Sequence, residues 1–138
     1  MTFSHLLDTN VLSRLMREPN GVSARHLAQV GDENVCTSVV VACELRFGAT
    51  LRGSDRLVAA VERVLEAISV LPLDQPSDEH YAAIRSDLQR RGTPIGPNDL
   101  LIAAQVRSLG LTLVTENEGE FRRVTELVVE NWQDSLGP

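Results

Sequence analysis

The chain has 138 residues, of which 43% are hydrophobic and 23% are charged. These are ordinary values for a globular protein of one domain, spanning residues 1–138, and they argue against intrinsic disorder. The net charge of −6 is unfavourable for binding nucleic acid, unless several acids gather around a metal ion. No apolar run approaches the length of a membrane span, and no apolar leader preceded by basic residues is evident, so we expect a cytoplasmic protein that does not engage membranes.

Short apolar stretches alternate with amphipathic ones along the whole chain. In chain order we expect a strand at 2–7, helices at 9–17 and 22–30, a strand at 34–37, helices at 39–47 and 54–68, a strand at 70–73, helices at 78–91 and 98–109, a strand at 111–115, a helical turn at 118–123 and a strand at 127–129. Ser38 is a suitable N-cap for the third helix, and Gly48 is expected to end it. Alternating strands and helices predict an α/β fold with a mostly parallel sheet.

The basic residues and the cysteines add little to this picture. All thirteen basic residues are arginines, which suits bidentate phosphate contacts, although a genome-wide composition bias explains the choice equally well. Cys36 and Cys43 fit neither a disulfide framework nor a metal motif. Because both lie in apolar stretches, we expect two buried thiols in a reducing cytosol.

Four acids lie in or beside apolar stretches, where a carboxylate is costly unless it is paired or bound to a cation. They are Asp8, Glu44, Asp99 and Glu120. Each has an ordinary explanation of its own. An acid at the start of a helix serves as a cap or interacts with the helix dipole, as for Asp8 and Asp99; Glu44 has a distant arginine as a candidate partner, and Glu120 is a candidate surface acid.

Taken together, the four acids indicate a different chemistry. Asp8 follows one predicted strand and Thr115 is the last residue of another, and the carboxyl ends of parallel strands are where ligands gather in α/β sheets. Carboxylates that meet there repel one another unless a divalent cation neutralises them. Oxygen ligands without Cys or His favour Mg²⁺, with Mn²⁺ as a substitute, and such ions assist the hydrolysis of phosphodiesters. No serine, cysteine or histidine motif supports a competing nucleophile.

Several segments in order along the chain resemble PIN-domain ribonucleases, above all the VapC toxins of bacterial VapBC toxin–antitoxin pairs. The segments are LLDTNVL, SVVVACELRFG, PIGPNDLLIAA, LVTENEGEF and VVENW. The resemblance implies a three-layer α/β/α PIN-like fold and an endoribonuclease that leaves 5′-phosphate and 3′-hydroxyl ends. The combination of RGTPIGPND and VTENEGEF is similar to the branch that cuts initiator tRNA.

The resemblance also implies roles for individual residues and partners. Asp8, Glu44, Asp99 and Glu120 would form the acidic pocket, with Asp8 and Asp99 as direct Mg²⁺ ligands and with Thr9, Asn10 and Thr115 as supporting polar groups. The expected partners are a cognate VapB-type antitoxin, an RNA substrate such as tRNA, a second copy in a homodimer, and operator DNA reached only through the antitoxin.

The sequence departs from the family pattern at one position and leaves other choices open. Glu116 stands where relatives often have Asn, and with Glu118 it adds negative charge near the pocket, so Glu118 competes with Glu120 as the fourth acid. Arginines that contact RNA are sought after the Glu44 helix and before the Asp99 loop, although each is equally a solvated helix residue. The candidates are Arg46, Arg52, Arg56, Arg85, Arg90 and Arg91.

Two other functions compete with the nuclease. One is a phosphatase or phosphotransferase that uses Asp8 as nucleophile, although the second aspartate that such enzymes often carry two positions later is absent. The other is a PIN-like module without catalysis that acts with its antitoxin on DNA. Apolar surface is expected on the helices between residues 22 and 68, where a partner would dock.

Overall fold

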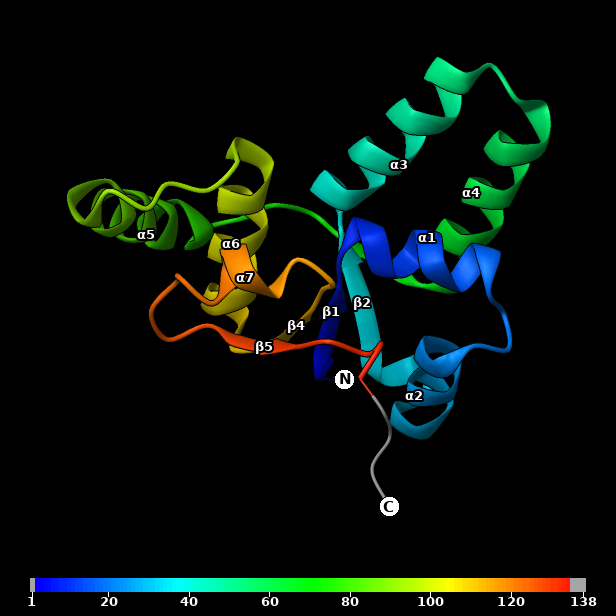
Figure 1. The fold of residues 1–138 in the computed structure, drawn as a ribbon, viewed down its shortest axis with the longest axis horizontal. Coiled ribbons are helices and arrows are strands. Elements are labelled where there is room, and N and C mark those ends of the chain that lie inside the picture. Colours follow the sequence, from blue (N-terminus) through cyan, green and yellow to red (C-terminus); the bar gives the residue numbers. More distant parts are fainter. Residues whose placement is uncertain (1, 135–138) are drawn as a thin grey trace.

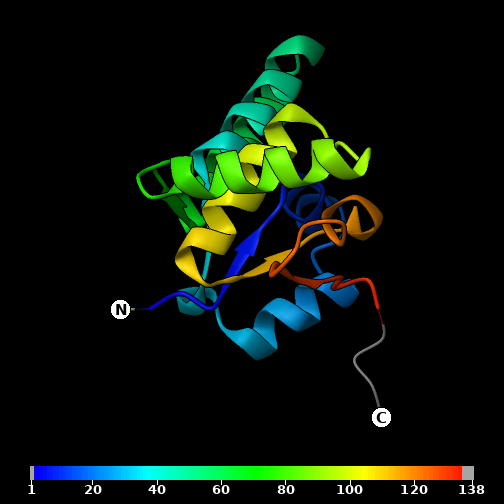
Figure 2. The same cartoon turned by 90° about the vertical axis from the view of Figure 1, so that its left-hand side faces the viewer.

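A computed structural model describes residues 2–134, which form a five-stranded sheet between two layers of helices (Figures 1 and 2). The strands are β1 (His5–Leu7), β2 (Val35–Ser38), β3 (Ser69–Leu71), β4 (Thr112–Val114) and β5 (Val128–Glu130). Their order in the sheet is β3-β2-β1-β4-β5, and every pairing is parallel. The predicted α/β/α architecture with a parallel sheet is confirmed.

Seven α-helices and one short 3₁₀ turn (Asp32–Asn34) connect the strands within residues 2–134. The helices are α1 (Thr9–Arg17), α2 (Val22–Val30), α3 (Val39–Arg52), α4 (Asp55–Ala67), α5 (Ser77–Arg91), α6 (Pro97–Leu109) and α7 (Glu118–Phe121). In Figure 1, α1 to α4 lie on one side of strands β1 and β2, while α5 and α6 lie on the other. None of the described helices combines the length and the apolarity that crossing a membrane requires.

The strand order places a topological switch point between β1 and β4. From β1 the chain moves through β2 to β3 at one edge, and it then crosses to β4 on the other side of β1. Leu7 pairs with Val114 in the register, and the backbone N–H of Asp8 donates to the carbonyl of Val114 at 2.9 Å. The residues that follow the two strands, Asp8 and Thr115, therefore lie side by side where ligands bind in open α/β sheets.

Helix α3 is longer than the sequence predicts. Ser38 caps it as expected, through a hydrogen bond of 3.0 Å from the N–H of Val40 to its hydroxyl. The helix does not stop at Gly48, however, but ends at Gly53, whose φ of 65° is the left-handed conformation that glycine adopts without strain. Glycine inside a helix weakens it without ending it, so the extra turn beyond Gly48 carries Arg52.

The core is apolar on both faces of the sheet, and it includes the chain's single tryptophan. Leu6, Leu113, Phe121 and Trp132 are fully or almost fully buried. The expectation of two buried thiols is wrong for one of them. Cys36 is buried, but Cys43 is exposed, because it lies on the outer face of α3.

Apolar side chains are exposed on the two helices of the α3–α4 hairpin, as expected for the region between residues 22 and 68. Phe47 is 67% exposed and Leu51 73% exposed; both lie on α3, and exposed Val39 lies about two turns before Phe47. Val58 on α4 is 40% exposed. The hairpin projects from the rest of the molecule in Figure 1 and so presents these side chains to solvent.

Candidate active site

Asp8 lies at the switch point, directly after β1 and before α1, and only 4% of its surface is exposed. Its Oδ1 accepts a hydrogen bond of 2.8 Å from the N–H of Thr9, which makes it the N-cap of α1, and its Oδ2 accepts one of 2.7 Å from the hydroxyl of Thr115. Burial raises the pKa of Asp8, the two hydrogen bonds oppose that shift, and the charges of Glu44 and Glu120 add to it. Helix capping thus accounts for the position of Oδ1, while Oδ2 is held by Thr115 and the carboxylate as a whole lies near Glu44 and Glu120.

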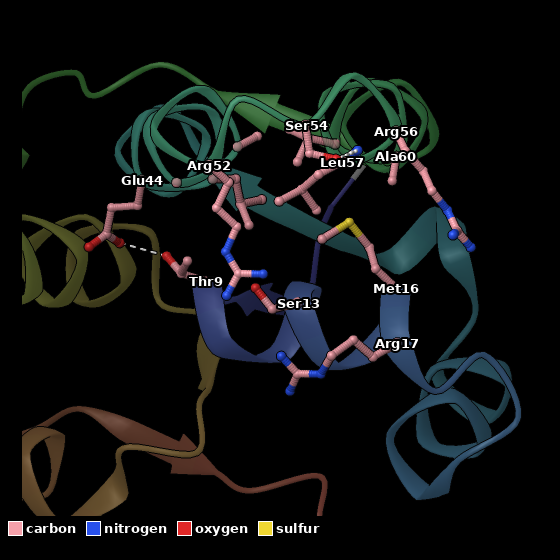
Figure 3. Close-up of a pocket in the computed structure, with 14 residues that line it drawn as sticks. Thr9, Ser13, Met16, Arg17, Glu44, Arg52, Ser54, Arg56, Leu57 and Ala60 are labelled. Atoms are coloured by element: carbon pink, nitrogen blue, oxygen red, sulfur yellow. Dashed lines mark hydrogen bonds between the residues drawn. The ribbon is translucent and has the colours of Figure 1, made fainter.

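Glu44 projects from α3 toward the first turns of α1 and α6. The hydroxyl of Thr9 donates to its Oε1 at 2.5 Å, a contact visible in Figure 3, and the amide of Asn98 donates to its Oε2 at 3.4 Å. Within residues 2–134 this carboxylate forms no ion pair with an arginine. The structure therefore gives Glu44 neutral donors from two neighbouring helices in place of the arginine partner considered from sequence.

Asp99, in the first turn of α6, and Glu120, in α7, both lie beside Gly96, the residue that precedes α6. The N–H of Gly96 donates to Oε1 of Glu120 at 2.6 Å, and the amide of Asn117 donates to its Oε2. A Cβ atom added to Gly96 would lie 3.6 Å from Oδ2 of Asp99 and 3.7 Å from Oε1 of Glu120. The two carboxylates, which are 21 positions apart in the chain, therefore border the same small space.

The electrostatics of the two acids differ because their hydrogen bonds differ. Burial, a hydrogen bond with Glu120, and the charges of Glu120, Asp8 and Glu44 raise the pKa of Asp99 to about 7. Burial by itself would raise the pKa of Glu120. Hydrogen bonds from Gly96, Asn117 and Asp99 outweigh burial and hold that pKa below its usual range. The charges of Glu44 and Glu120 thus act on both Asp8 and Asp99, whose pKa values burial also raises.

Glu118 is directed away from this group. Its carboxylate accepts a hydrogen bond of 2.6 Å from the amide of Asn131 and pairs with Arg122, one turn along the chain, at 3.3 Å. Both contacts hold the pKa of Glu118 below its usual range. The placement favours Glu120 over Glu118 as the fourth acid of the site.

The extra charge expected from Glu116 is neutralised. Arg14 on α1 makes two hydrogen bonds to its carboxylate, at 2.9 and 2.7 Å, and the backbone N–H of Glu116 donates to Oδ1 of Asn10 at 3.0 Å. The predicted supporting residue Asn10 therefore acts on the backbone of the β4–α7 loop. This bidentate pair and the Asn10 contact fix α1 to the β4–α7 loop, which leads directly into the helix that carries Glu120.

Four residues around the acids were not singled out from sequence. They are Arg14, Gly96, Asn98 and Asn117. Asn98 directly precedes Asp99 in the sequence, and this position could have marked it as a neighbour of the acids. Arg14 and Gly96 act through contacts with residues about 100 and 24 positions away, so nothing local marks them.

The donor set suits a hard cation held partly by water. No three His, Cys, Asp or Glu side chains within residues 2–134 are arranged to enclose a metal ion by themselves. Mg²⁺ seldom uses such a cage, since it binds through one or two carboxylates and keeps several waters. The mutual charge interactions of Asp8 and Asp99, with their raised pKa values, are what a divalent cation would relieve.

Comparisons with known proteins identify the family. The PIN-domain model matches residues 5–127, which is most of the chain. The chain belongs to the PIN-domain family, in its VapC branch. It is 37% identical to the tRNA(fMet)-specific endonuclease VapC of Shigella flexneri over 92% of this chain and 96% of that protein, and 35% identical to ribonuclease VapC2 of Haemophilus influenzae over 93% and 97%.

Solved VapC-type structures share the fold over more than nine tenths of the chain. The DNA-bound VapBC complex of Salmonella typhimurium matches with a TM-score of 0.86 and 32% identity, covering 94% of this chain and 98% of that one. VapC-type PIN-domain nucleases depend on divalent metal ions. The acidic neighbourhood of Asp8 and Asp99 is the part of this VapC-type chain whose chemistry fits that dependence.

Proposed function

We propose that this VapC-type chain is a Mg²⁺-dependent endoribonuclease, the toxin of a type II toxin–antitoxin pair, with initiator tRNA as its substrate. The proposal is supported by contacts that link the four acids in pairs beside the switch point of a parallel sheet: Thr9 contacts both Asp8 and Glu44, and Asp99 and Glu120 both lie beside Gly96. The family match and the relative named as a tRNA(fMet)-specific endonuclease support it.

Asp8 and Asp99 are the proposed ligands of Mg²⁺. When bound there, the ion would supply a lowered pKa for a water and positive charge near the phosphate and the leaving oxygen. Thr9 and Thr115 hold the Asp8 carboxylate in one orientation, and Thr9 also holds Glu44. Because hydrogen bonds keep the pKa of Glu120 low, Glu120 is ionised at neutral pH and adds negative charge that favours the cation.

The reaction is hydrolysis of a phosphodiester. A water oxygen forms a bond to phosphorus, the bond from phosphorus to the 3′ oxygen breaks, and that oxygen takes up a proton. The products are a 3′-hydroxyl and a 5′-phosphate. The half-buried Glu44, held by neutral donors, is placed beside the Asp8–Thr9 corner, where a carboxylate can accept the proton of the attacking water.

The alternative use of Asp8 as a covalent nucleophile is disfavoured by its surroundings. A nucleophilic oxygen must reach phosphorus, yet Asp8 is 4% exposed and both of its oxygens already accept hydrogen bonds. The structure thus supports a ligand role in place of an attacking role.

The partners proposed for the chain follow from its relatives. Solved complexes of relatives pair the PIN domain with an antitoxin on DNA. We infer that a VapB-type antitoxin neutralises this chain in the bacterial cytoplasm, that operator DNA is reached only through the antitoxin, and that the toxin itself forms a homodimer. The exposed side chains of α3 supply apolar surface for these contacts.

The proposal is tested by incubating the purified chain with total tRNA in Mg²⁺ and in EDTA. Cleavage in Mg²⁺ with new 5′-phosphate ends, its loss in EDTA, and its loss in Asp8→Asn and Asp99→Asn are the expected results. An Asp99→Asn variant that folds normally and cleaves tRNA at the wild-type rate would show that the site is wrongly assigned.

A further inference from the structure

A groove of about 510 Å³ lies between α1, α3 and α4, directly beside the acidic site. Thr9 and Glu44, which are hydrogen-bonded to each other, form one end of it (Figure 3). Its volume lies within the range of sites that hold small ligands or parts of polymers. A ligand long enough to fill the groove would therefore also contact the acidic site at the end formed by Thr9 and Glu44.

Two arginines line this groove from opposite helices. Arg17 extends from α1 and Arg52 from the last turn of α3, and Figure 3 shows both guanidinium groups on the side of the groove where the Ser13 hydroxyl lies. The guanidinium of Arg56, a third lining residue, points away from Ser13 in the same view. The groove thus presents two cations and a hydroxyl within one region.

Arg17 and Arg52 have no carboxylate partner among the described residues, unlike Arg14, Arg46, Arg91 and Arg122. Neither forms an ion pair within residues 2–134, and both are exposed. By contrast Arg14 pairs with Glu116, Arg46 with Glu62 and Arg91 with Asp87. Of the arginines considered from sequence as RNA contacts, Arg46 and Arg91 are already engaged. The other four, Arg52, Arg56, Arg85 and Arg90, form no ion pair within residues 2–134, and of these Arg52 is the one whose guanidinium lies on the Ser13 side of the groove.

The spacing along α1 aligns the cations with the acids. Thr9, Ser13 and Arg17 are four residues apart and so lie on one face of the helix. At about 1.5 Å per residue, Arg17 is displaced about 12 Å along the axis from Thr9. A polyanion whose reacting phosphate lies at the acids would therefore bring phosphates a few nucleotides away to the two arginines.

The floor of the groove is apolar. Met16 from α1, Leu45 from α3, and Leu57 and Val61 from α4 contribute to it. A base has an apolar face that such side chains can cover, while the charged backbone follows cations at the rim. The arginines therefore suit the phosphate of a nucleotide, and the apolar side chains suit its base.

We propose that the α1–α3–α4 groove binds the RNA strand that flanks the cleaved bond, with Arg17 and Arg52 contacting its phosphates. This inference rests on the proposed ribonuclease function and specifies how the substrate is held. An acidic peptide would satisfy the arginines too, but the groove is continuous with the acids that act on phosphate, and this favours RNA.

The test compares RNA binding by Arg17→Gln, Arg52→Gln and the double variant. Binding of fluorescein-labelled bulk tRNA is measured in EDTA by fluorescence anisotropy across a range of salt, so that no cleavage occurs. Arg25→Gln, which removes an exposed arginine of α2 outside the groove, is the matched control. Thermal melting verifies that every variant folds.

Each groove variant is expected to reduce the slope of log K against log salt by about 0.7, and the double variant to raise Kd roughly tenfold at low salt. In cleavage assays KM should rise while kcat stays near the wild-type value, since neither arginine touches the acids. Arg25→Gln should match the wild type in both assays.

Three outcomes separate the possibilities. Wild-type Kd and salt slope in the double variant, together with normal cleavage by the unmodified chain, would overturn the groove proposal while leaving the ribonuclease intact. Unchanged RNA binding with a loss of antitoxin binding would also overturn it and assign the groove to an acidic peptide. Failure of the unmodified chain to cleave any tRNA would refute the proposed function itself.

Discussion

Replacing Asp99 with Asn should abolish RNA cleavage and at the same time stabilise the metal-free protein. The pKa of Asp99 rises from 3.8 to about 7, first because of burial and then because of Glu120 and the other acids. A group whose pKa is higher in the folded state contributes stability at low pH and loses it as pH rises toward that pKa. Above about pH 7, ionised Asp99 therefore destabilises the fold, and asparagine does not.

The magnitude follows from the pKa difference. At about 1.4 kcal/mol per pH unit, the interval from 3.8 to about 7 corresponds to about 4 kcal/mol. Because the Asp99 side chain is half-exposed, solvent screens the repulsion, and about 2 kcal/mol is a better figure. Asparagine also loses a favourable helix-dipole interaction of about 0.5 kcal/mol at the first turn of α6. The net gain is about 1.5 kcal/mol, or roughly 5 °C in Tm.

The assay is thermal unfolding in EDTA between about pH 4 and pH 8. The advantage of Asp99→Asn should be absent near pH 4, grow up to about pH 7 and then stay constant. Asp78→Asn is the control, since Asp78 lies in the first turn of α5 and is exposed, and this variant should lower Tm slightly at neutral pH. Adding Mg²⁺ should raise the Tm of the wild type but not that of Asp99→Asn. A Tm of Asp99→Asn at or below the wild-type value at pH 8 in EDTA would refute the reasoning.

Three further predictions concern the supports of the site. Thr115→Val removes the 2.7 Å hydrogen bond to buried Asp8, so it should cost about 1–3 kcal/mol and slow cleavage. Thr112→Val, at the start of the strand that Thr115 follows, should retain activity; equal activity of the two variants would contradict this. Arg14→Gln and Glu116→Gln should each reduce cleavage, and the double variant should be no worse than either single variant; additive losses would show that the ion pair does not act as a unit. At limiting Mg²⁺, cleavage should rise up to tenfold per pH unit below about pH 7 and level off above it, because Asp99 must lose its proton to bind the cation; a flat profile from about pH 5 to pH 8 would count against Asp99 as a ligand.

The sequence predicted the fold well because strand and helix signals in this chain are local. Apolar periodicity and caps such as Ser38 identify each element within a few residues. The prediction went wrong at Gly48, because a glycine ends a helix only if the following residues stop making the helical backbone hydrogen bonds. In this chain those hydrogen bonds continue past Gly48, and the left-handed conformation that ends α3 occurs at Gly53. Cys43 was misplaced because an apolar stretch does not reveal which face of a helix meets solvent.

The acidic residues of the site were also visible in sequence, because a carboxylate inside an apolar stretch is conspicuous by itself. Their supports were not, since Arg14 and Gly96 act through partners far away in the chain. Arg17 was missed for the same reason. Its value as an anion contact depends on having no carboxylate nearby, and only the assembled helices show which arginines are already paired.

The most direct test of the central claim is an anomalous difference map from crystals of the chain soaked in Mn²⁺ near pH 8. The account predicts a peak between the carboxylates of Asp8 and Asp99, with waters completing the coordination. A map with no peak at these two side chains, in crystals whose acids are accessible to solvent, would contradict the account.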